Sequence, residues 1–326
     1  MDTEYRPPAK LMRVEIWSRC NYSCRFCCWQ RDDAAKPALM FTPGQIQSLC
    51  RALVATGCHN VNLTGGEPLL APMGYLCETI AAIRDVAGIN RLWATTNGST
   101  LRAPGVCERL AAAGLTELAV SVASETDQGY RAYTDTSVTL TQILRGVEIA
   151  QTHGISVRLH VPLCRAGIQT FEQLETLLDK AAAAGVTEAF YFGLHNSESL
   201  AGDFDAQYVD PGAITEGFTR SDRWCFGETE TGRPYFSDGF MRVDVPRPMI
   251  RLVTDTCKAN NCGALCQGIY SAYCVPGSDG WVLRACNRIF NSHENEFALP
   301  PDLLEHGREL ELAHLLKSVW GYAYEQ

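Results

Sequence analysis

The sequence predicts an α/β fold in which a parallel sheet curves into a barrel or partial barrel with helices outside. Short β-type runs alternate with helical patterns from residue 11 to about residue 192, and six βα-type units can be distinguished. Parallel strands are usually covered on both faces, so this repeat places helices around the sheet. A chain of 326 residues that is 46% hydrophobic is large enough for one such unit and a smaller module.

Each expected element is marked by its hydrophobic period and by the turn residues beside it. Thr42 followed by Pro43 fits a helix N-cap and a first helical position. The strands are expected at residues 11–17, 60–63, 91–95, 117–122, 156–161 and 188–192. The helices are expected at residues 42–56 and 73–86, in a stretch ending near 114, and at 138–153 and about 171–184.

Three cysteines directly follow the first expected strand, in the run Cys20-Asn-Tyr-Ser-Cys24-Arg-Phe-Cys27. A strand that leads into such a loop presents three thiolates at one end of a sheet, and grouped thiolates suit zinc or an iron–sulfur cluster. Three ligands, where a structural site normally has four, leave one metal position free for a substrate or cofactor. Two alternatives stay open at this point: a zinc knuckle with a distant fourth ligand, or buried thiols that pack as small apolar residues.

Further polar motifs follow the next strands, and the C-terminal ends of parallel strands meet at one end of a barrel. Thr64-Gly65-Gly66-Glu67-Pro68-Leu69 follows the second strand, Thr95-Thr96-Asn97-Gly98 ends the third, and Ser121 ends the fourth. Paired glycines let the backbone approach a ligand closely, so exposed N–H and C=O groups can receive a zwitterion while Glu67 accepts from its ammonium. Taken alone, the glycine pair fits a plain βα turn equally well.

The spacing C-x3-C-x2-C with Phe26 before its last cysteine, together with Gly-Gly-Glu-Pro, resembles the radical S-adenosylmethionine (radical SAM) superfamily. The resemblance implies that Cys20, Cys24 and Cys27 are the catalytic ligands of a [4Fe–4S] cluster whose fourth iron binds the amino and carboxylate groups of SAM. One electron from the cluster would then cleave SAM to methionine and a 5′-deoxyadenosyl radical, which abstracts a hydrogen atom from the substrate. The fold implied is a partial (β/α)6 TIM-like barrel.

The order of these motifs over residues 11–195 is most similar to the branch that contains the molybdenum-cofactor GTP cyclase and the SPASM/twitch enzymes. By this resemblance the residues that contact SAM are Phe26, Gly65, Gly66, Glu67, Pro68, Thr96, Asn97, Ser121 and Arg158. Arg158 would pair with the SAM carboxylate. On the fifth strand, His160-Val-Pro162-Leu replaces the usual asparagine-bearing pattern, which leaves the adenine contacts open. His160 is expected to face inward, either as a core histidine or as a substrate contact.

A second group of cysteines lies near the C-terminus, beside a predicted β-hairpin with strands at residues 271–275 and 281–286. This region resembles a twitch domain, the half-size relative of SPASM, in which a hairpin and adjoining cysteines hold an auxiliary [4Fe–4S] cluster. The expected ligands are Cys257, Cys262, Cys266 and Cys286, with Cys274 in reserve. The alternatives are zinc, which also favours four thiolates, and three-cysteine ligation that leaves one iron open. An amphipathic helix is expected over residues 303–320.

The motifs divide the chain into three expected parts: a barrel over residues 1–195, an irregular linker or substrate loop over 196–250, and an auxiliary-cluster domain over 251–326 that ends in the helix. The middle part is rich in turn residues and shows little hydrophobic periodicity, which is typical of a lid or binding loop. Substrate contact and ordinary surface packing are equally open for four of its side chains, Arg223, Trp224, Arg233 and Tyr235.

Composition excludes several classes of function. The net charge of −9 argues against general nucleic-acid binding, which normally requires a basic surface. No run of about 18 apolar residues is present and the N-terminus lacks the apolar core of a signal peptide, so we expect no membrane association and a cytoplasmic location. Fifteen cysteines in a reducing compartment indicate metal binding rather than disulfides.

The resemblance implies an enzyme of specialised metabolism, such as antibiotic biosynthesis, that acts on a small sugar or nucleoside. No leader-peptide domain is recognised before the barrel, which favours a small molecule over a peptide. The auxiliary cluster would take up an electron, bind the substrate or donate sulfur, and a flavodoxin or ferredoxin-type reductant would supply electrons. The alternatives are decarboxylation or epimerisation of a sugar acid, peptide modification and, outside enzymology, an iron–sulfur electron carrier.

Overall fold

Alternation of side chains along each strand gives the central sheet an apolar outer face and a more polar inner face. On β1 (Leu11–Trp17), Met12, Val14 and Ile16 are fully buried in the core beneath the helices. Arg13 lies between them in sequence and therefore points to the opposite face, because successive side chains of a strand alternate. The sheet meets its helices through one face and keeps polar groups on the other.

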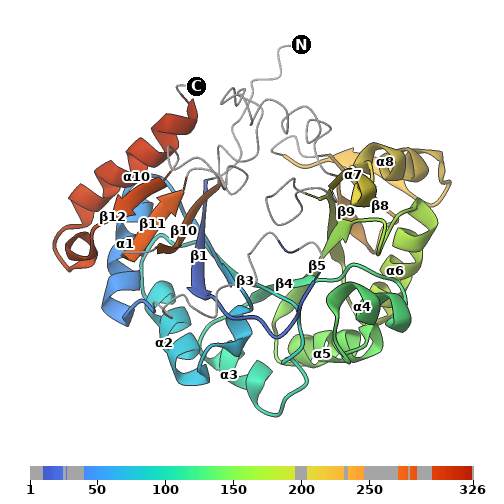
Figure 1. The fold of residues 1–326 in the computed structure, drawn as a ribbon, viewed down its shortest axis with the longest axis horizontal. Coiled ribbons are helices and arrows are strands. Elements are labelled where there is room, and N and C mark those ends of the chain that lie inside the picture. The colour runs from blue at the N-terminus through green and yellow to red at the C-terminus, as the bar shows by residue number, and fades with distance from the viewer. Residues whose placement is uncertain are drawn as a thin grey trace.

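The computed structural model describes residues 10–24, 27, 40–194, 204–230, 234–245, 271–277, 280–284 and 296–324. Within these ranges the six expected strands are present and lie parallel in chain order. Their bounds are β1 (Leu11–Trp17), β2 (Asn60–Gly65), β3 (Arg91–Thr96), β4 (Glu117–Ser121), β5 (Ser156–Leu163) and β6 (Glu188–Gly193). Figure 1 shows these strands around the centre of the molecule with the helices outside them. The predicted α/β fold with a partial barrel is confirmed.

Helices begin where the sequence provides an N-cap. Thr42, Thr139 and Thr170 each accept from the backbone of a glutamine three residues later, whose side chain bonds back to the cap. The expected helices are α1 (Pro43–Ala55), α2 (Met73–Arg84), α3 (Val106–Ala112), α5 (Leu140–Thr152) and α6 (Phe171–Ala183). An additional helix, α4 (Asp127–Thr134), was not expected because Gly129 interrupts its short pattern. No helix in the described ranges is long and apolar enough to cross a membrane.

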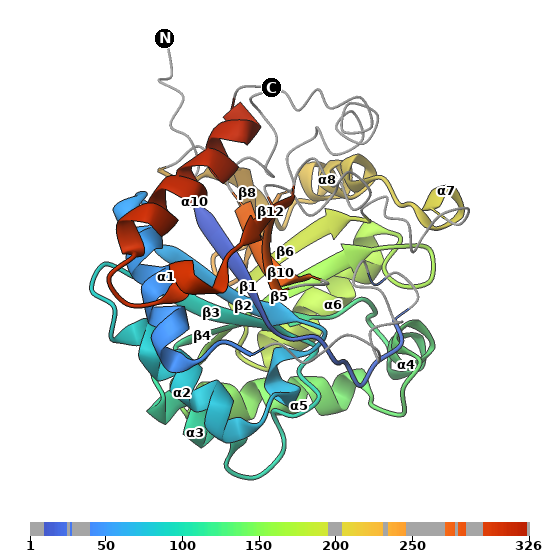
Figure 2. The ribbon, with the colours of Figure 1, turned by 60° about the vertical axis from the view of Figure 1, so that its left-hand side comes forward.

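The predicted C-terminal hairpin is present and continues the barrel sheet. β10 (Ser271–Gly277) pairs in parallel with β1, and β11 (Gly280–Arg284) and β12 (Glu296–Leu299) follow in antiparallel order. Next to this edge, α10 (Glu309–Tyr324) packs on α1 after the short helix η6 (Pro301–Leu304), as Figure 2 shows. The C-terminal helix begins later than expected because the prolines before it lead into a separate 3-10 turn.

The opposite edge of the sheet comes from residues 196–250, which we expected to be irregular. β9 (Arg242–Asp244) pairs in parallel with β6, and β8 (Pro234–Ser237) and β7 (Cys225–Glu228) follow in antiparallel order. α8 (Pro211–Arg220) packs on α6 beside them. The expectation of an irregular stretch is therefore wrong for the described part of this segment. Strands of three or four residues are too short to show a hydrophobic period in the sequence.

Aromatic packing holds this segment against the barrel. Phe218 of α8 is fully buried and stacks on Phe236 of β8 with 5.0 Å between the ring centroids. Trp224 lies edge-on to Phe218 at 5.1 Å and donates its ring N–H to the Glu175 carboxylate at 2.9 Å. The Arg223 guanidinium forms ion pairs with Asp179 of α6 and with Asp238, which follows β8. Trp224 and Arg223 thus have structural roles here and are dropped as substrate contacts.

The C-terminal hairpin docks on the barrel through a ring pair whose contribution can be measured. Phe41, just before α1, stacks on Trp281 of β11 with centroids 3.7 Å apart, and both side chains are buried. We expect Phe41→Ala to lower the free energy of unfolding by about 3–5 kcal/mol, because it removes the stack and leaves a cavity. Leu310→Ala is the control, since Leu310 is 75% exposed. Equal effects of the two changes in urea unfolding would contradict this expectation.

Candidate active site

The cysteine loop lies over the C-terminal ends of three barrel strands. Cys24 packs against a buried cluster formed by Ala123, Tyr133, Cys164 and Leu194. Three of its members, Ala123, Cys164 and Leu194, follow the last residues of β4, β5 and β6 by one or two positions. These strand ends are where a parallel barrel gathers its functional loops. The loop that follows β1 therefore reaches across the barrel to the strands on the far side.

The loop is held from the side by α4, the helix that the sequence analysis missed. The backbone N–H of Ser23 donates to the Thr134 carbonyl at 3.2 Å, and the Tyr22 ring lies edge-on to Tyr130 with 6.4 Å between centroids. The Tyr130 hydroxyl donates to the Asn97 carbonyl at 3.3 Å. Tyr130 thus links the cysteine loop to the loop after β3. No spacing in the sequence pairs these two tyrosines, so only the fold identifies this link.

The glycine pair lets the loop after β2 lie directly against the cysteine loop. Gly66 N–H donates to the Trp17 carbonyl and Glu67 N–H to the Arg19 carbonyl, both at 2.8 Å. A Cβ on Gly65, whose φ is 142°, would lie 2.1 Å from the Trp17 oxygen, so no larger residue fits there. We expected these N–H groups to face a ligand. They are instead used to join two loops, and that expectation is corrected.

The carboxylate of Glu67 joins the loop after β2 to the loop after β3. Its Oε1 accepts from the Thr96 hydroxyl at 2.6 Å and from Leu69 N–H at 3.0 Å, and its Oε2 accepts from Asn97 N–H at 2.6 Å. The side chain is 1% exposed. Burial raises the pKa of Glu67 to about 7, and the three hydrogen bonds oppose that shift. The SAM ammonium that we expected at this carboxylate would have to reach a side chain that is buried and already accepts three hydrogen bonds, so the role of Glu67 in these contacts is to hold the two loops together.

Asn97 reaches from the loop after β3 to the cysteine loop. Its side-chain N–H group donates to Asn21 Oδ1 at 2.9 Å and lies 3.8 Å from Cys20 Sγ. Cys20 Sγ also accepts from Tyr22 N–H at 3.4 Å. Burial raises the pKa of the Cys20 thiol, and the bonds from Tyr22 and Asn97 act in the opposite direction. Asn97 and Cys20, predicted from separate motifs, are therefore brought together.

Other predicted residues lie close to this centre. Thr96 is buried, and its hydroxyl accepts from Gly98 N–H at 3.0 Å in addition to its bond to Glu67. Pro68 begins the short helix η2 (Pro68–Leu70) and is buried as well. Ser121, at the end of β4, is partly exposed. Of these residues, Ser121 is the one placed to contact a ligand directly, while Thr96 and Pro68 support the loops.

Arg158 lies deeper in the barrel than Ser121. It is paired with Ala119 of β4, two residues before Ser121, or roughly 7 Å further down the strand. Its guanidinium is 3.4 Å from the Glu117 carboxylate and lies over the Trp93 ring, which also carries Arg91 on its face. Burial and, to a smaller extent, neighbouring Arg91 lower the pKa of Arg158 to about 10. This position does not fit the expected pairing with the SAM carboxylate, so we leave Arg158 out of the SAM-binding set.

Comparison with known proteins identifies the arrangement. Residues 14–178, just over half of the chain, match the family described as "Radical SAM superfamily". The chain belongs to the radical SAM superfamily. The matched segment begins in β1 and ends in α6, so it contains the cysteine loop and both polar loops described above.

Curated relatives of this radical SAM chain include several GTP 3′,8-cyclases. GTP 3′,8-cyclase 1 of Pseudomonas aeruginosa is 29% identical over 181 residues, 55% of this chain and 53% of its own. GTP 3′,8-cyclase of Synechococcus elongatus is 37% identical over 133 residues, 39% and 38% of the two chains, and that of Aquifex aeolicus is 32% identical over 158 residues, 47% of each. The chain spans about half the length of the curated relatives that it matches. They support the branch suggested by the order of the motifs.

Solved structures agree with the fold over most of the chain. Streptococcus suis SuiB bound to S-adenosylmethionine has a TM-score of 0.62 at 13% identity and covers 93% of this chain and 67% of its own. Native anSMEcpe with bound AdoMet has a TM-score of 0.57 at 12% identity, with 92% and 82% covered. At these identities the likeness establishes the radical SAM fold.

The radical SAM superfamily uses a [4Fe–4S] cluster and SAM, and the donor set here fits that pair. Cys20, Cys24 and Cys27 are each at least partly exposed at the end of the barrel. Each thiolate of such a cluster binds a different iron, so the sulfurs need not converge on one point. Within the described residues, no group of three His, Cys, Asp or Glu side chains is suited to a single metal ion. Three cysteines would leave the fourth iron for SAM.

Several predicted site residues lie outside the described residues. They are the SAM contact Phe26 and the four expected ligands of the auxiliary cluster, Cys257, Cys262, Cys266 and Cys286. The reserve ligand, Cys274, lies on β10 and is fully buried in the hydrophobic core. Burial raises the pKa of its thiol far above the ordinary value. A thiol in the apolar core between sheet and helices is poorly placed to bind iron, so Cys274 is better described as a core residue.

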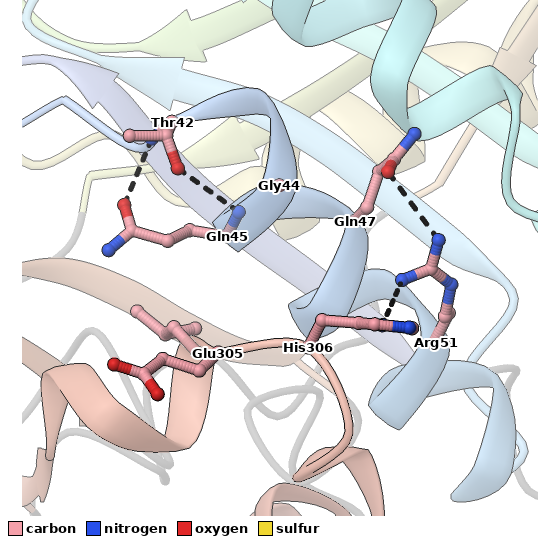
Figure 3. A pocket seen from close by; sticks show the side chains of 8 residues that line it. Thr42, Gly44, Gln45, Gln47, Arg51, Glu305 and His306 are labelled. Carbon is pink, nitrogen blue, oxygen red and sulfur yellow. Dashed lines mark hydrogen bonds between the residues drawn. The ribbon is translucent and has the colours of Figure 1, made fainter.

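A surface pocket that the sequence did not indicate lies apart from these residues. It has a volume of about 470 Å³ and lies between the first turns of α1 and the segment around η6. Figure 3 shows Arg51 in this pocket, 3.4 Å from Gln47 Oε1 and 3.5 Å from His306 Nδ1. The pocket is on the outer, helix-covered side of the sheet, and none of the predicted site residues lines it.

The buried Glu67 carboxyl makes stability depend on pH. Its pKa is raised from 4.5 to about 7, so the folded state holds the proton more tightly than the unfolded state does. Its contribution is therefore fully present below about pH 4.5 and is lost as pH rises through about 7, a loss of roughly 3 kcal/mol. We expect the difference in unfolding free energy between wild type and Glu67→Gln to shrink from pH 5 to pH 8. Glu216→Gln, at an exposed helix position, is the control. A constant difference would contradict the expectation.

Proposed function

We propose that this radical SAM enzyme acts on a small sugar or nucleoside-type substrate in specialised metabolism. The observation that carries the proposal is the polar inner face directly below the cysteine loop. There, Ser121 and Thr95 are partly exposed, and Thr95 exchanges hydrogen bonds with Asn62 at 3.1–3.2 Å. Hydroxyl and amide groups of this kind suit a substrate rich in hydroxyls. The curated relatives support a nucleoside, because their name gives GTP, a nucleotide, as substrate.

In this proposal Cys20, Cys24 and Cys27 hold the cluster. When bound, the cluster and SAM supply one-electron cleavage of SAM, which yields a radical able to abstract hydrogen. Asn97 and Ser121 orient SAM from the ends of β3 and β4. Glu67 acts through other groups, because its hydrogen bonds fix the loop that carries Asn97.

We also propose that Cys257, Cys262, Cys266 and Cys286 hold an auxiliary [4Fe–4S] cluster in a twitch-like region over residues 251–326. It would take up an electron from the substrate, bind the substrate or donate sulfur, so dehydrogenation and sulfur insertion are the favoured outcomes. A flavodoxin or ferredoxin-type protein would be the reductant. The hairpin formed by β10 and β11 supports this proposal, because adjoining cysteines would lie next to it.

Reductive cleavage of SAM tests the function directly. Under anaerobic conditions with dithionite, the reconstituted wild type should release 5′-deoxyadenosine, and Cys20/Cys24/Cys27→Ala should release none, because the cluster ligands are gone. The control is Cys77/Cys225→Ala, which removes two cysteines outside the site. Addition of nucleosides, sugar phosphates or short peptides should raise the yield with a nucleoside or sugar and not with a peptide. An electron carrier would release no 5′-deoxyadenosine from the wild type.

Iron content separates the two clusters. The Cys20/Cys24/Cys27→Ala variant should still bind about four irons per chain, held by the C-terminal cysteines and visible in Mössbauer spectra. A fourfold Cys257/Cys262/Cys266/Cys286→Ala variant should also bind about four and should keep the SAM-binding cluster. If the first variant binds no iron, the C-terminal cysteines hold zinc or no metal, and the auxiliary cluster is refuted.

A further inference from the structure

Three aromatic rings line the inner face of the sheet on neighbouring strands. His160 lies on β5, and Phe190 and Phe192 lie on β6. Their neighbours Leu159, Val161 and Tyr191 are buried in the core beneath the helices, so the three rings face the other way. All three remain partly exposed, and none belongs to the hydrophobic core. We call His160, Phe190 and Phe192 the aromatic wall.

The rings of the aromatic wall are arranged as one surface. Phe190 and Phe192 stack with 5.6 Å between centroids and 22° between planes. His160 stands edge-on to both, at 5.9 Å from Phe190 and 6.3 Å from Phe192. A nearly parallel pair of phenyl rings presents apolar surface suited to another flat ring, and the imidazole beside it adds a polar group.

The aromatic wall lies one layer below the cysteine loop. His160 is level with Ser121 of β4 on one side and with Phe190 on the other. Cys24 packs against the buried cluster that contains Cys164 and Leu194, which follow the C-terminal ends of β5 and β6. A molecule that touches the wall therefore lies beneath the cluster ligands, on the side where the substrate of this enzyme must approach.

The chemistry of His160 fits an uncharged partner. Burial lowers its pKa well below the ordinary value, and Arg158, Arg13 and Arg91 deeper in the barrel lower it further. The ring is therefore neutral at pH 7, with one nitrogen that donates and one that accepts. Within the described ranges no hydrogen bond to this ring is found, so both nitrogens are available to a ligand.

We propose that the aromatic wall binds the base of a nucleoside substrate, which packs against the stacked Phe190–Phe192 pair while His160 hydrogen-bonds a heteroatom at the edge of the base. The inference rests on the proposed function and specifies its substrate class. A flat heteroaromatic ring matches the parallel phenyl pair better than a puckered sugar does, and neutral imidazole matches the neutral donors and acceptors of a base.

Binding of free nucleosides tests the wall. Adenosine, guanosine, cytidine and uridine are titrated into the reconstituted, SAM-loaded enzyme by anaerobic calorimetry. At least one should bind the wild type. Phe190→Leu/Phe192→Leu should weaken that nucleoside about tenfold or more, because stacking is lost while apolar volume is kept. His160→Leu should weaken it about tenfold, and His160→Gln, which keeps a donor and an acceptor, by less than about threefold. The Kd of SAM should change by less than about twofold in all variants.

Tyr191→Phe is the matched control, because Tyr191 is on β6 with its hydroxyl bonded to Thr215 on the outer side. If the double variant does not fold, Phe192→Leu alone carries the test. The proposal is overturned if no nucleoside binds the wild type, if the variants bind it as tightly as the wild type, or if they lose SAM instead. Failure of the proposed function is a separate result, since it appears as a wild type that releases no 5′-deoxyadenosine.

Discussion

One buried carboxylate sets the arrangement of the loops at the end of this barrel. Glu67 accepts hydrogen bonds from its own loop and from Thr96 and Asn97 of the next one. Asn97 in turn bonds to Asn21 and lies beside Cys20 in the cysteine loop. Three segments that are far apart in sequence are thereby fixed relative to one another. Because buried acceptors are costly to leave unpaired, this arrangement has few alternatives of similar energy.

The glycines before Glu67 make the same arrangement sterically feasible. The loops touch through backbone groups, and a side chain at Gly65 or Gly66 would overlap the chain between Trp17 and Arg19. The motif thus has a packing role as well as its family association. Residues interpreted from the sequence as ligand contacts divide into two groups in the structure: Ser121 is partly exposed at the end of β4, whereas Glu67, Thr96 and Asn97 hydrogen-bond to one another or to neighbouring loops.

The inner face of the sheet has layers of different chemistry. The deepest layer holds ion pairs among Arg91, Glu117 and Arg158, with Trp93 between the two arginines. The layer above it contains the aromatic wall, and the cysteine loop covers the top. Burial, together with the positive charge of the layer below, lowers the pKa of His160 and keeps its ring neutral. A substrate in this barrel would meet apolar rings first and charge only at greater depth.

The sequence by itself determined the α/β class, the six strands and the three cysteines, because these depend on local periodicity and on fixed spacing. It also located Glu67 and Asn97, though as ligand contacts. Only the tertiary structure decided that Glu67 and Asn97 hydrogen-bond to each other and that Arg158 lies deep in the barrel. It also decided that residues 225–244 form strands and that α4 holds the cysteine loop. Those features depend on which side chains meet across the barrel, and contacts between distant segments leave no periodic signal in a single chain.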